Sequence, residues 1–280
     1  MIYLALGILA STLVLLLFRG IASTSANTAH VIMAGYLISA LCGLGLFPVR
    51  LDDIPPLLIL AAAVEGVAFY VVFRLMAQTT QVNGVAIAGI ASKMGVIIPI
   101  GIGIIALGES ASWLKLFGMA AGIAAVVLPL GGNLSRGDWR WPVMVFLGTG
   151  CIDASFKLFQ VWGLAESEFP SLITVIFGFA FIASVLHQLR DGAQWMNRVS
   201  VAFSVPLGIA NFATVYFLMM ALARSGWESS VVYPINNFGV ILCAALAGVF
   251  LFRERPSVRT WGGIGLAGLA IGLLYLENIQ

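Results

Sequence analysis

The chain has 280 residues, of which 61% are apolar and 9% are charged, and its formal net charge is +2. Soluble globular proteins are nearer to half apolar and a quarter charged, so this composition excludes an ordinary soluble domain and a disordered chain. The small positive charge also excludes an extended basic surface for nucleic acid. We therefore interpret the sequence as a multi-pass membrane protein.

Turn residues and charges divide the chain into long apolar runs, and a membrane-spanning helix needs about 20 such residues. A transmembrane barrel would instead show alternating segments of about ten residues, so we predict an all-α fold. The first run lacks a preceding basic stretch and a clear cleavage site, and we interpret it as a retained helix. The ten predicted spans are residues 2–19, 30–48, 56–77, 81–107, 111–130, 141–163, 169–189, 200–223, 229–252 and 258–276.

The two halves of the chain resemble each other when one is shifted by 145 residues. Glu109 then aligns with Glu254, and Gly118 aligns with Gly263. Each half holds five predicted spans, an odd number, so the second half enters the membrane in the opposite orientation. Such inverted repeats are typical of secondary transporters. The alternative is a chance likeness between apolar, glycine-rich helices. The predicted segments are a first five-helix repeat, a connecting loop and a second five-helix repeat, at residues 1–130, 131–140 and 141–280.

Motifs in both halves carry a family resemblance. The second half contains Val231-Val-Tyr-Pro-Ile-Asn-Asn-Phe, Phe250-Leu-Phe-Arg-Glu and Trp261-Gly-Gly-Ile-Gly, and the first half contains Ser92-Lys93, Pro99, Leu107-Gly-Glu and Gly118 to Gly122. Together they resemble the EamA family of the drug/metabolite transporter superfamily. The resemblance covers nearly the whole chain. It implies ten helices, a central cavity between the halves and the movement of small metabolites or drugs, and it does not identify the substrate.

Four charged residues lie well inside predicted spans: Glu65, Lys93, Asp153 and Lys157. A charge at the bilayer centre costs about 2.5–3.5 kcal/mol on insertion scales, so each is expected to pair or to line a wet cavity. We predict that Lys93 binds a carboxylate or phosphate of the substrate and that Glu65 or Asp153 binds a coupling proton. The alternatives are a structural pair of Lys93 with Glu65 or Asp153, and an intrahelical pair between Asp153 and Lys157 one turn apart.

Prolines are predicted to interrupt helices in both halves. Pro99 lies six residues after Lys93 and is expected to loosen the turn around Gly95. Pro234 is expected to break the ninth span beside two amides. Interrupted helices in the two halves of a transporter mark its binding site. The predicted substrate contacts, besides Lys93, are Tyr233, Asn236, Asn237, Asn211, Tyr36 and Tyr70. Helix–helix packing is the alternative role for each of them.

The chain has no phosphate-binding loop, no nucleophile elbow and no metal-ligand cluster in its sequence. We therefore predict no enzyme activity, cofactor or metal, and a carrier driven by gradients. The predicted function is alternating-access transport of a small polar or amphipathic metabolite, first an amino-acid-like zwitterion and next an organic anion, coupled to protons or working by exchange. The alternative is a lipid-handling flippase component or a non-transporting partner subunit. The predicted partners are a small-molecule substrate and membrane lipids, without nucleic acid.

Loop charges predict the orientation. Odd-numbered loops carry eight basic residues and the other side carries three, so the positive-inside rule places odd loops in the cytoplasm and both termini outside. The predicted location is a cell membrane, a bacterial inner membrane. Arg19 and Arg74, near span ends, are interpreted as headgroup anchors. A monomer is sufficient for the doubled layout, and small-residue faces on the fifth and tenth spans leave a homodimer open.

Overall fold

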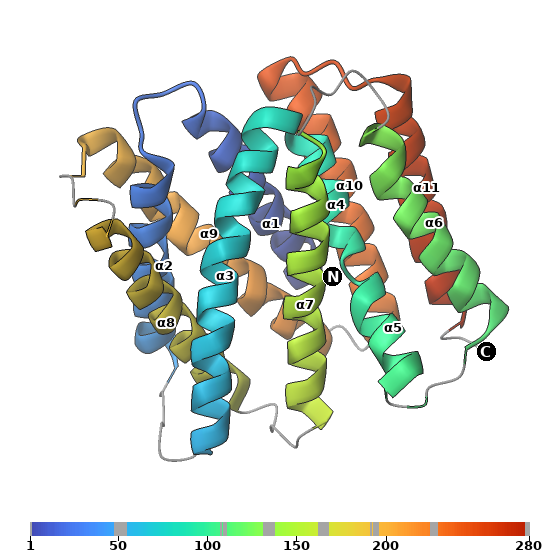
Figure 1. The fold of residues 1–280 in the computed structure, drawn as a ribbon, viewed down its shortest axis with the longest axis horizontal. Coiled ribbons are helices and arrows are strands. Elements are labelled where there is room, and N and C mark those ends of the chain that lie inside the picture. The colour runs from blue at the N-terminus through green and yellow to red at the C-terminus, as the bar shows by residue number, and fades with distance from the viewer. Residues whose placement is uncertain are drawn as a thin grey trace.

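The computed structural model describes residues 2–47, 55–106, 108, 111–130, 138–161, 168–190, 192, 196–224 and 229–277. These residues form a bundle of long helices and contain no strand (Figure 1). Within them, nine helical segments are long and apolar enough to cross a membrane, when Val85–Ala106 is taken as one. The predicted all-α, multi-pass membrane fold is thus confirmed.

The first half contains α1 (Ile2–Ile21), α2 (Thr28–Leu46), α3 (Pro56–Asn83), α4 (Val85–Met94), α5 (Ile97–Ala106) and α6 (Trp113–Leu130). The second half contains α7 (Arg140–Val161), α8 (Phe169–Arg190), α9 (Arg198–Arg224), α10 (Ser229–Phe252) and α11 (Val258–Glu277). Of these, α7 carries Asp153 and Lys157 and is not among the nine apolar segments.

The third helix runs beyond its predicted end at residue 77. Thr79 and Thr80 belong to it because their hydroxyls donate to the carbonyls of Leu75 and Met76, both at 2.7 Å. These bonds satisfy the polar side chains within the helix, so the polar run there does not end it. Gly84, with φ +93°, then separates α3 from α4.

The fourth span is broken at the predicted place. Helix α4 ends at Met94 and α5 begins at Ile97, so the break falls at Gly95. Pro99 has no N–H for the carbonyl four residues earlier, which is that of Gly95. The break rests on α7, where a Cβ at position 95 would meet the Thr149 hydroxyl at 2.5 Å.

The predicted break at Pro234 is wrong. Helix α10 runs without interruption from Ser229 to Phe252. Pro234 is the sixth residue of this helix, so its missing N–H removes one hydrogen bond close to the helix end. The helix continues through the following turns, and among the described residues the interrupted span is the one in the first half.

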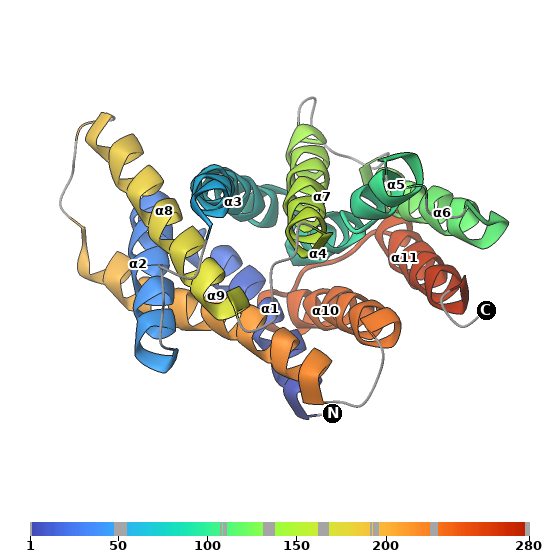
Figure 2. The same ribbon diagram turned by 90° about the horizontal axis from the view of Figure 1, so that it is seen from below.

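The halves pack on each other through matched sets of helices. In the predicted repeat, α1, α2, α3 and α4 correspond to α7, α8, α9 and α10. The contact of α2 with α9 is matched by that of α8 with α3. The contacts of α1 with α9 and α10 are matched by those of α7 with α3 and α4. The pairs α2–α8, α4–α10 and α6–α11 pack directly. In the end view, α8, α3 and α7 lie along one side and α9, α1 and α10 along the other, with α6 and α11 at one end (Figure 2).

Part of the small-residue faces of α6 and α11 is used within the chain, while a Cβ at Gly265 or Gly272 would have open space. A Cβ at Gly118 would meet Leu274 Cγ at 2.9 Å, and one at Gly263 would meet the Ala125 carbonyl at 2.8 Å. These glycines let the two helices approach closely. Their contacts need no second copy of the chain.

Candidate functional site

Three of the charges inside the membrane come together from three helices. Glu65 of α3, Lys93 of α4 and Asp153 of α7 lie on helices that pack on one another. Val72 packs against Gly148, and this antiparallel register brings Glu65 next to Ser155 and Asp153. Asp153 also interacts electrostatically with Lys93. We call Glu65, Lys93 and Asp153 the charge cluster.

The charge cluster is only loosely bonded. Glu65 is 6% exposed, and its Oε1 has no hydrogen-bond partner among the described residues. Within that part of the chain, no ion pair within 4 Å joins the three side chains. Lys93 is half-buried and Asp153 is exposed. Asp153 interacts electrostatically with Glu65 of α3 and with Lys93 of α4. The cluster therefore has an acceptor and charges of both signs available to a ligand.

Helix α10 brings its amides to the same depth. It runs antiparallel to α4, and a Cβ at Gly89 would lie 3.2 Å from Ala244 Cβ and 3.8 Å from Ile241 Cα. One helical turn further along both helices, Lys93 lies level with Asn237. Asn236 turns toward α1, where its Oδ1 would lie 3.8 Å from a Cβ at Gly7. The Asn236 amide donates to Asn237 Oδ1 at 3.5 Å.

Three other predicted contacts make hydrogen bonds between or along helices. The Tyr36 hydroxyl donates to the Phe69 carbonyl at 2.9 Å, and Asn211 Nδ2 donates to Ser39 Oγ at 3.3 Å. The Tyr70 hydroxyl accepts from Arg74 Nη1 at 3.5 Å. None of these three bonds involves a residue of the charge cluster. The side chains of Lys157 and Tyr233 lie outside the described part of the chain.

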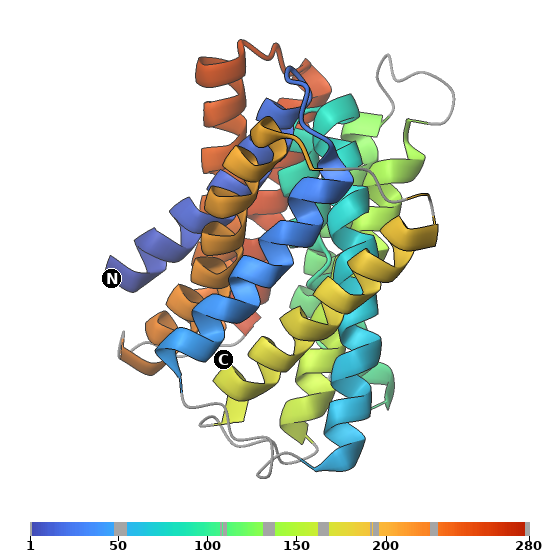
Figure 3. The ribbon, with the colours of Figure 1, turned by 90° about the vertical axis from the view of Figure 1, so that its left-hand side faces the viewer.

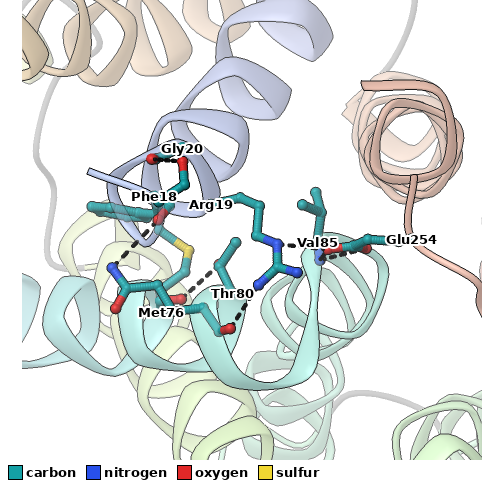
Figure 4. Close-up of polar contacts among 9 residues, drawn as sticks. Phe18, Arg19, Gly20, Met76, Thr80, Val85 and Glu254 are labelled. Carbon is teal, nitrogen blue, oxygen red and sulfur yellow. Dashed lines mark hydrogen bonds and ion pairs between the residues drawn. The ribbon is translucent and has the colours of Figure 1, made fainter. Parts of the chain in front are cut away.

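A second charged group ties several helix ends together (Figure 4). Arg19 Nε lies 3.0 Å from Glu254 Oε1, and Arg19 Nη1 donates to the Gln81 carbonyl at 2.7 Å. The Val85 N–H, at the start of α4, donates to both oxygens of Glu254 at 3.2 and 3.3 Å. We call Arg19, Glu254 and the Gly84–Val85 junction the polar tie. The interpretation of Arg19 as a headgroup anchor is wrong, because its guanidinium points to Glu254.

Two opposing influences act on the pKa of Glu254 in the polar tie. Burial raises the pKa of Glu254, while the Arg19 guanidinium and the Val85 N–H lower it. The carboxylate also faces the positive end of the α4 dipole. Glu254 follows Arg253, whose φ of +53° lies in the left-handed region and turns the chain back over Gly248. Arg74, the other predicted anchor, instead bonds His187 Nε2 at 2.8 Å.

No family model matches the chain. The chain is similar to the spermidine export protein MdtI of Photorhabdus laumondii subsp. laumondii, a member of the drug/metabolite transporter superfamily. The two sequences are 34% identical over 103 residues, which are 35% of this chain and 89% of the relative. The chain belongs to that superfamily.

Two further comparisons cover more of this drug/metabolite transporter. An uncharacterized protein of Haemophilus influenzae is 25% identical over 210 residues, 73% of this chain and 71% of that protein. A solved crystal structure, described only as that of a protein, superposes with a TM-score of 0.61 and 13% identity over 97% of both chains. That likeness shows the fold alone.

An apolar pocket lies away from both charged groups of the transporter. It is lined by Phe47, Pro170, Ile173, Phe212, Val215, Tyr216 and Met220. It sits between α2, α8 and α9, on the side of the molecule that Figure 3 turns to the viewer. The rings of Phe212 and Tyr216 stack at 6.0 Å with an interplanar angle of 15°. Phe47 follows the end of α2 and packs on both rings.

Sequence reasoning missed the polar tie. Glu254 stands between two arginines in a loop, where an acidic residue is ordinarily solvated. The available signal was its repetition at Glu109, which indicates a role tied to the fold. Glu109 lies outside the described residues.

Proposed function

We propose that this protein is a secondary transporter that moves a small polar or amphipathic metabolite by alternating access. Two inverted five-helix units, residues 1–130 and 141–280, would rock against each other. The matched packing of α1 with α9 and of α7 with α3 supports this arrangement. The arrangement is also the one that the EamA resemblance implies.

The observation that carries the proposal is the loosely bonded charge cluster. A buried carboxylate with an unpaired oxygen is costly, so it is retained where a ligand or a proton satisfies it. Lys93 binds an acidic group of the substrate, and Glu65 or Asp153 binds an ammonium group or the coupling proton. Asn236, Asn237 and Tyr233 supply hydrogen bonds, while Asn211, Tyr36 and Tyr70 hold the surrounding helices.

The favoured substrate is an amino-acid-like zwitterion, because the cluster offers charges of both signs. An organic anion is the next candidate, since Lys93 alone would hold it. The relative named for spermidine export adds an amine to the classes that need testing. Two carboxylates beside one lysine suit an ammonium group electrostatically.

Ligand-induced thermal stabilisation tests the substrate class. Purified protein is heated with amino acids, organic acids and spermidine in turn, since a ligand that binds only the folded form raises the melting temperature. The best stabiliser is then supplied to proteoliposomes. We expect Lys93→Ala to lower uptake by about tenfold or more, while Lys115→Ala, a matched change at the start of α6, leaves uptake unchanged. Equal uptake by wild type and Lys93→Ala would refute the role of Lys93.

The apolar pocket favours the lipid-handling alternative. Its lining carries almost no polar surface, as expected for a site that holds an acyl chain. Under this alternative, labelled phospholipid crosses proteoliposome membranes faster with the protein than without it. Replacement of Met220 by Trp would fill the pocket and slow that exchange. A partner subunit without transport activity would show neither metabolite uptake nor phospholipid movement, and it would co-purify with a carrier.

A further inference from the structure

We infer that the polar tie is a gate, closed in this structure, at one face of the transport path. This face, which we call the Glu254 face, is the end of the bundle where α1, α3 and α10 end and where α2, α4 and α11 begin. The inference rests on the proposed transport function. It assigns the closing contact to Arg19, Glu254 and the first turn of α4.

The tie joins the two halves of the chain. Glu254 belongs to the second half, whereas Arg19 and Val85 belong to the first. When one five-helix unit rocks against the other, the loop that carries Glu254 must leave α1 and the α3–α4 junction. The ion pair and both bonds to the Val85 N–H then break together.

Other polar bonds between the halves gather at the same face. Asn197 Nδ2 donates to the Ser25 carbonyl at 2.7 Å, the Asn27 N–H to Ser200 Oγ at 2.8 Å, and Gln188 Nε2 to the Ala29 carbonyl at 3.1 Å. At the opposite face, the described residues show one such bond, from Arg224 to the Tyr3 hydroxyl at 3.5 Å. These bonds join the described helices of the two halves at the Glu254 face.

Two glycines let the carboxylate reach the start of α4. A Cβ at Gly84 would meet Glu254 Oε2 at 2.9 Å, and a Cβ at Gly248 would meet it at 2.7 Å. The Glu254 side chain is 12% exposed, so the groups around it nearly cover it. Once Glu254 leaves, water reaches the N–H groups at the start of α4, which remain satisfied. The contact is thus strong when closed and reversible when opened.

Cysteine labelling beneath the tie tests the gate without a known substrate. Ala244 is fully buried against Gly89, about one helical turn below the tie between α4 and α10. Ala244→Cys is placed in a background with Cys42, Cys151 and Cys243 replaced by Ala, and its reaction with a membrane-impermeant maleimide is timed in vesicles of both orientations. We expect Glu254→Gln and Arg19→Gln to speed labelling about fivefold or more, and only from the Glu254 face.

Controls separate gating from unfolding. Arg255→Gln removes an exposed charge from the same loop and should leave the labelling rate unchanged. Ala270→Cys reports on the α6–α11 pair, away from the tie, and should stay unlabelled in every variant that keeps a sharp melting transition. The gate is overturned if both tie variants remain folded and label Ala244→Cys at the rate of the parent. That result would refute the gate without affecting the transport proposal. Conversely, if Lys93→Ala takes up substrate as fast as the wild type, the role of Lys93 in transport is refuted and the gate is not.

Discussion

The two charged groups differ in how completely their polar atoms are bonded. In the polar tie, Glu254 receives bonds from Arg19 and from the Val85 N–H. In the charge cluster, Glu65 is more deeply buried and keeps an oxygen without a partner among the described residues. A buried polar group that is left unpaired costs about 1–3 kcal/mol. The tie therefore stabilises the conformation described here, whereas the cluster retains a cost that a ligand or proton can offset.

The largest expected effect is the loss of coupled transport when Glu65 is neutralised. Glu65→Gln keeps the size and hydrogen-bonding capacity of the side chain and removes its ability to take up a proton. We expect uptake driven by a pH gradient to fall about tenfold or more, while exchange of internal for external substrate continues. Counterflow and gradient-driven uptake in the same proteoliposomes measure both. Equal losses in the two assays would assign Glu65 to substrate binding instead of coupling.

The same substitution made in the two groups should change stability in opposite directions. Glu254→Gln leaves Arg19 without its counter-charge and weakens the bonds to Val85, so we expect a loss of about 1 kcal/mol, discounted because Arg19 is partly exposed. Glu65→Gln removes a buried charge without breaking an ion pair and should raise the melting temperature. Thermal unfolding in one detergent, without ligand, gives the comparison. A lower melting temperature for both variants would show that Glu65 is bonded as fully as Glu254.

Two glycines with positive φ test how tightly the start of α4 is built around Glu254. Gly84 and Gly192 have φ values of +93° and +84°, but a Cβ meets Glu254 only at Gly84 and has open space at Gly192. Alanine is strained at both positions by the positive φ, and it is strained further at Gly84, where a ψ of 167° places the backbone in a region that is essentially restricted to glycine. We expect Gly84→Ala to cost about 1 kcal/mol more than Gly192→Ala because Glu254 must also move. Equal melting temperatures for the two variants would mean that the start of α4 and Glu254 shift freely.

The helices follow from the sequence more directly than the polar contacts do. Apolar length alone places most spans, and the cost of membrane charges singles out Glu65, Lys93 and Asp153. Which partners a charge meets depends on the rotation and register of each helix, which a single sequence does not record. Position near a span end alone therefore assigns Arg19 to the headgroups. A proline in an apolar run predicts a break, but Pro234 lies in the second turn of α10, where the missing N–H removes one hydrogen bond and the helix continues.

The smallest expected effect is a pH shift within the polar tie. Burial raises the pKa of Glu254, so the folded protein binds this proton more tightly than the unfolded chain does, and stability falls as pH rises through the raised pKa. Arg19 opposes that rise. In Arg19→Gln the pKa of Glu254 should therefore be higher still, which moves the fall in stability to higher pH and makes it larger. Melting temperatures of Arg19→Gln measured from about pH 4 to about pH 9 should show this decline.

The double variant Arg19→Gln with Glu254→Gln is the control. It should lose the part of the decline that Glu254 causes, because Gln does not titrate. An unchanged profile in the double variant would assign the decline to another group and leave the Arg19–Glu254 pair without a role in the protonation of Glu254.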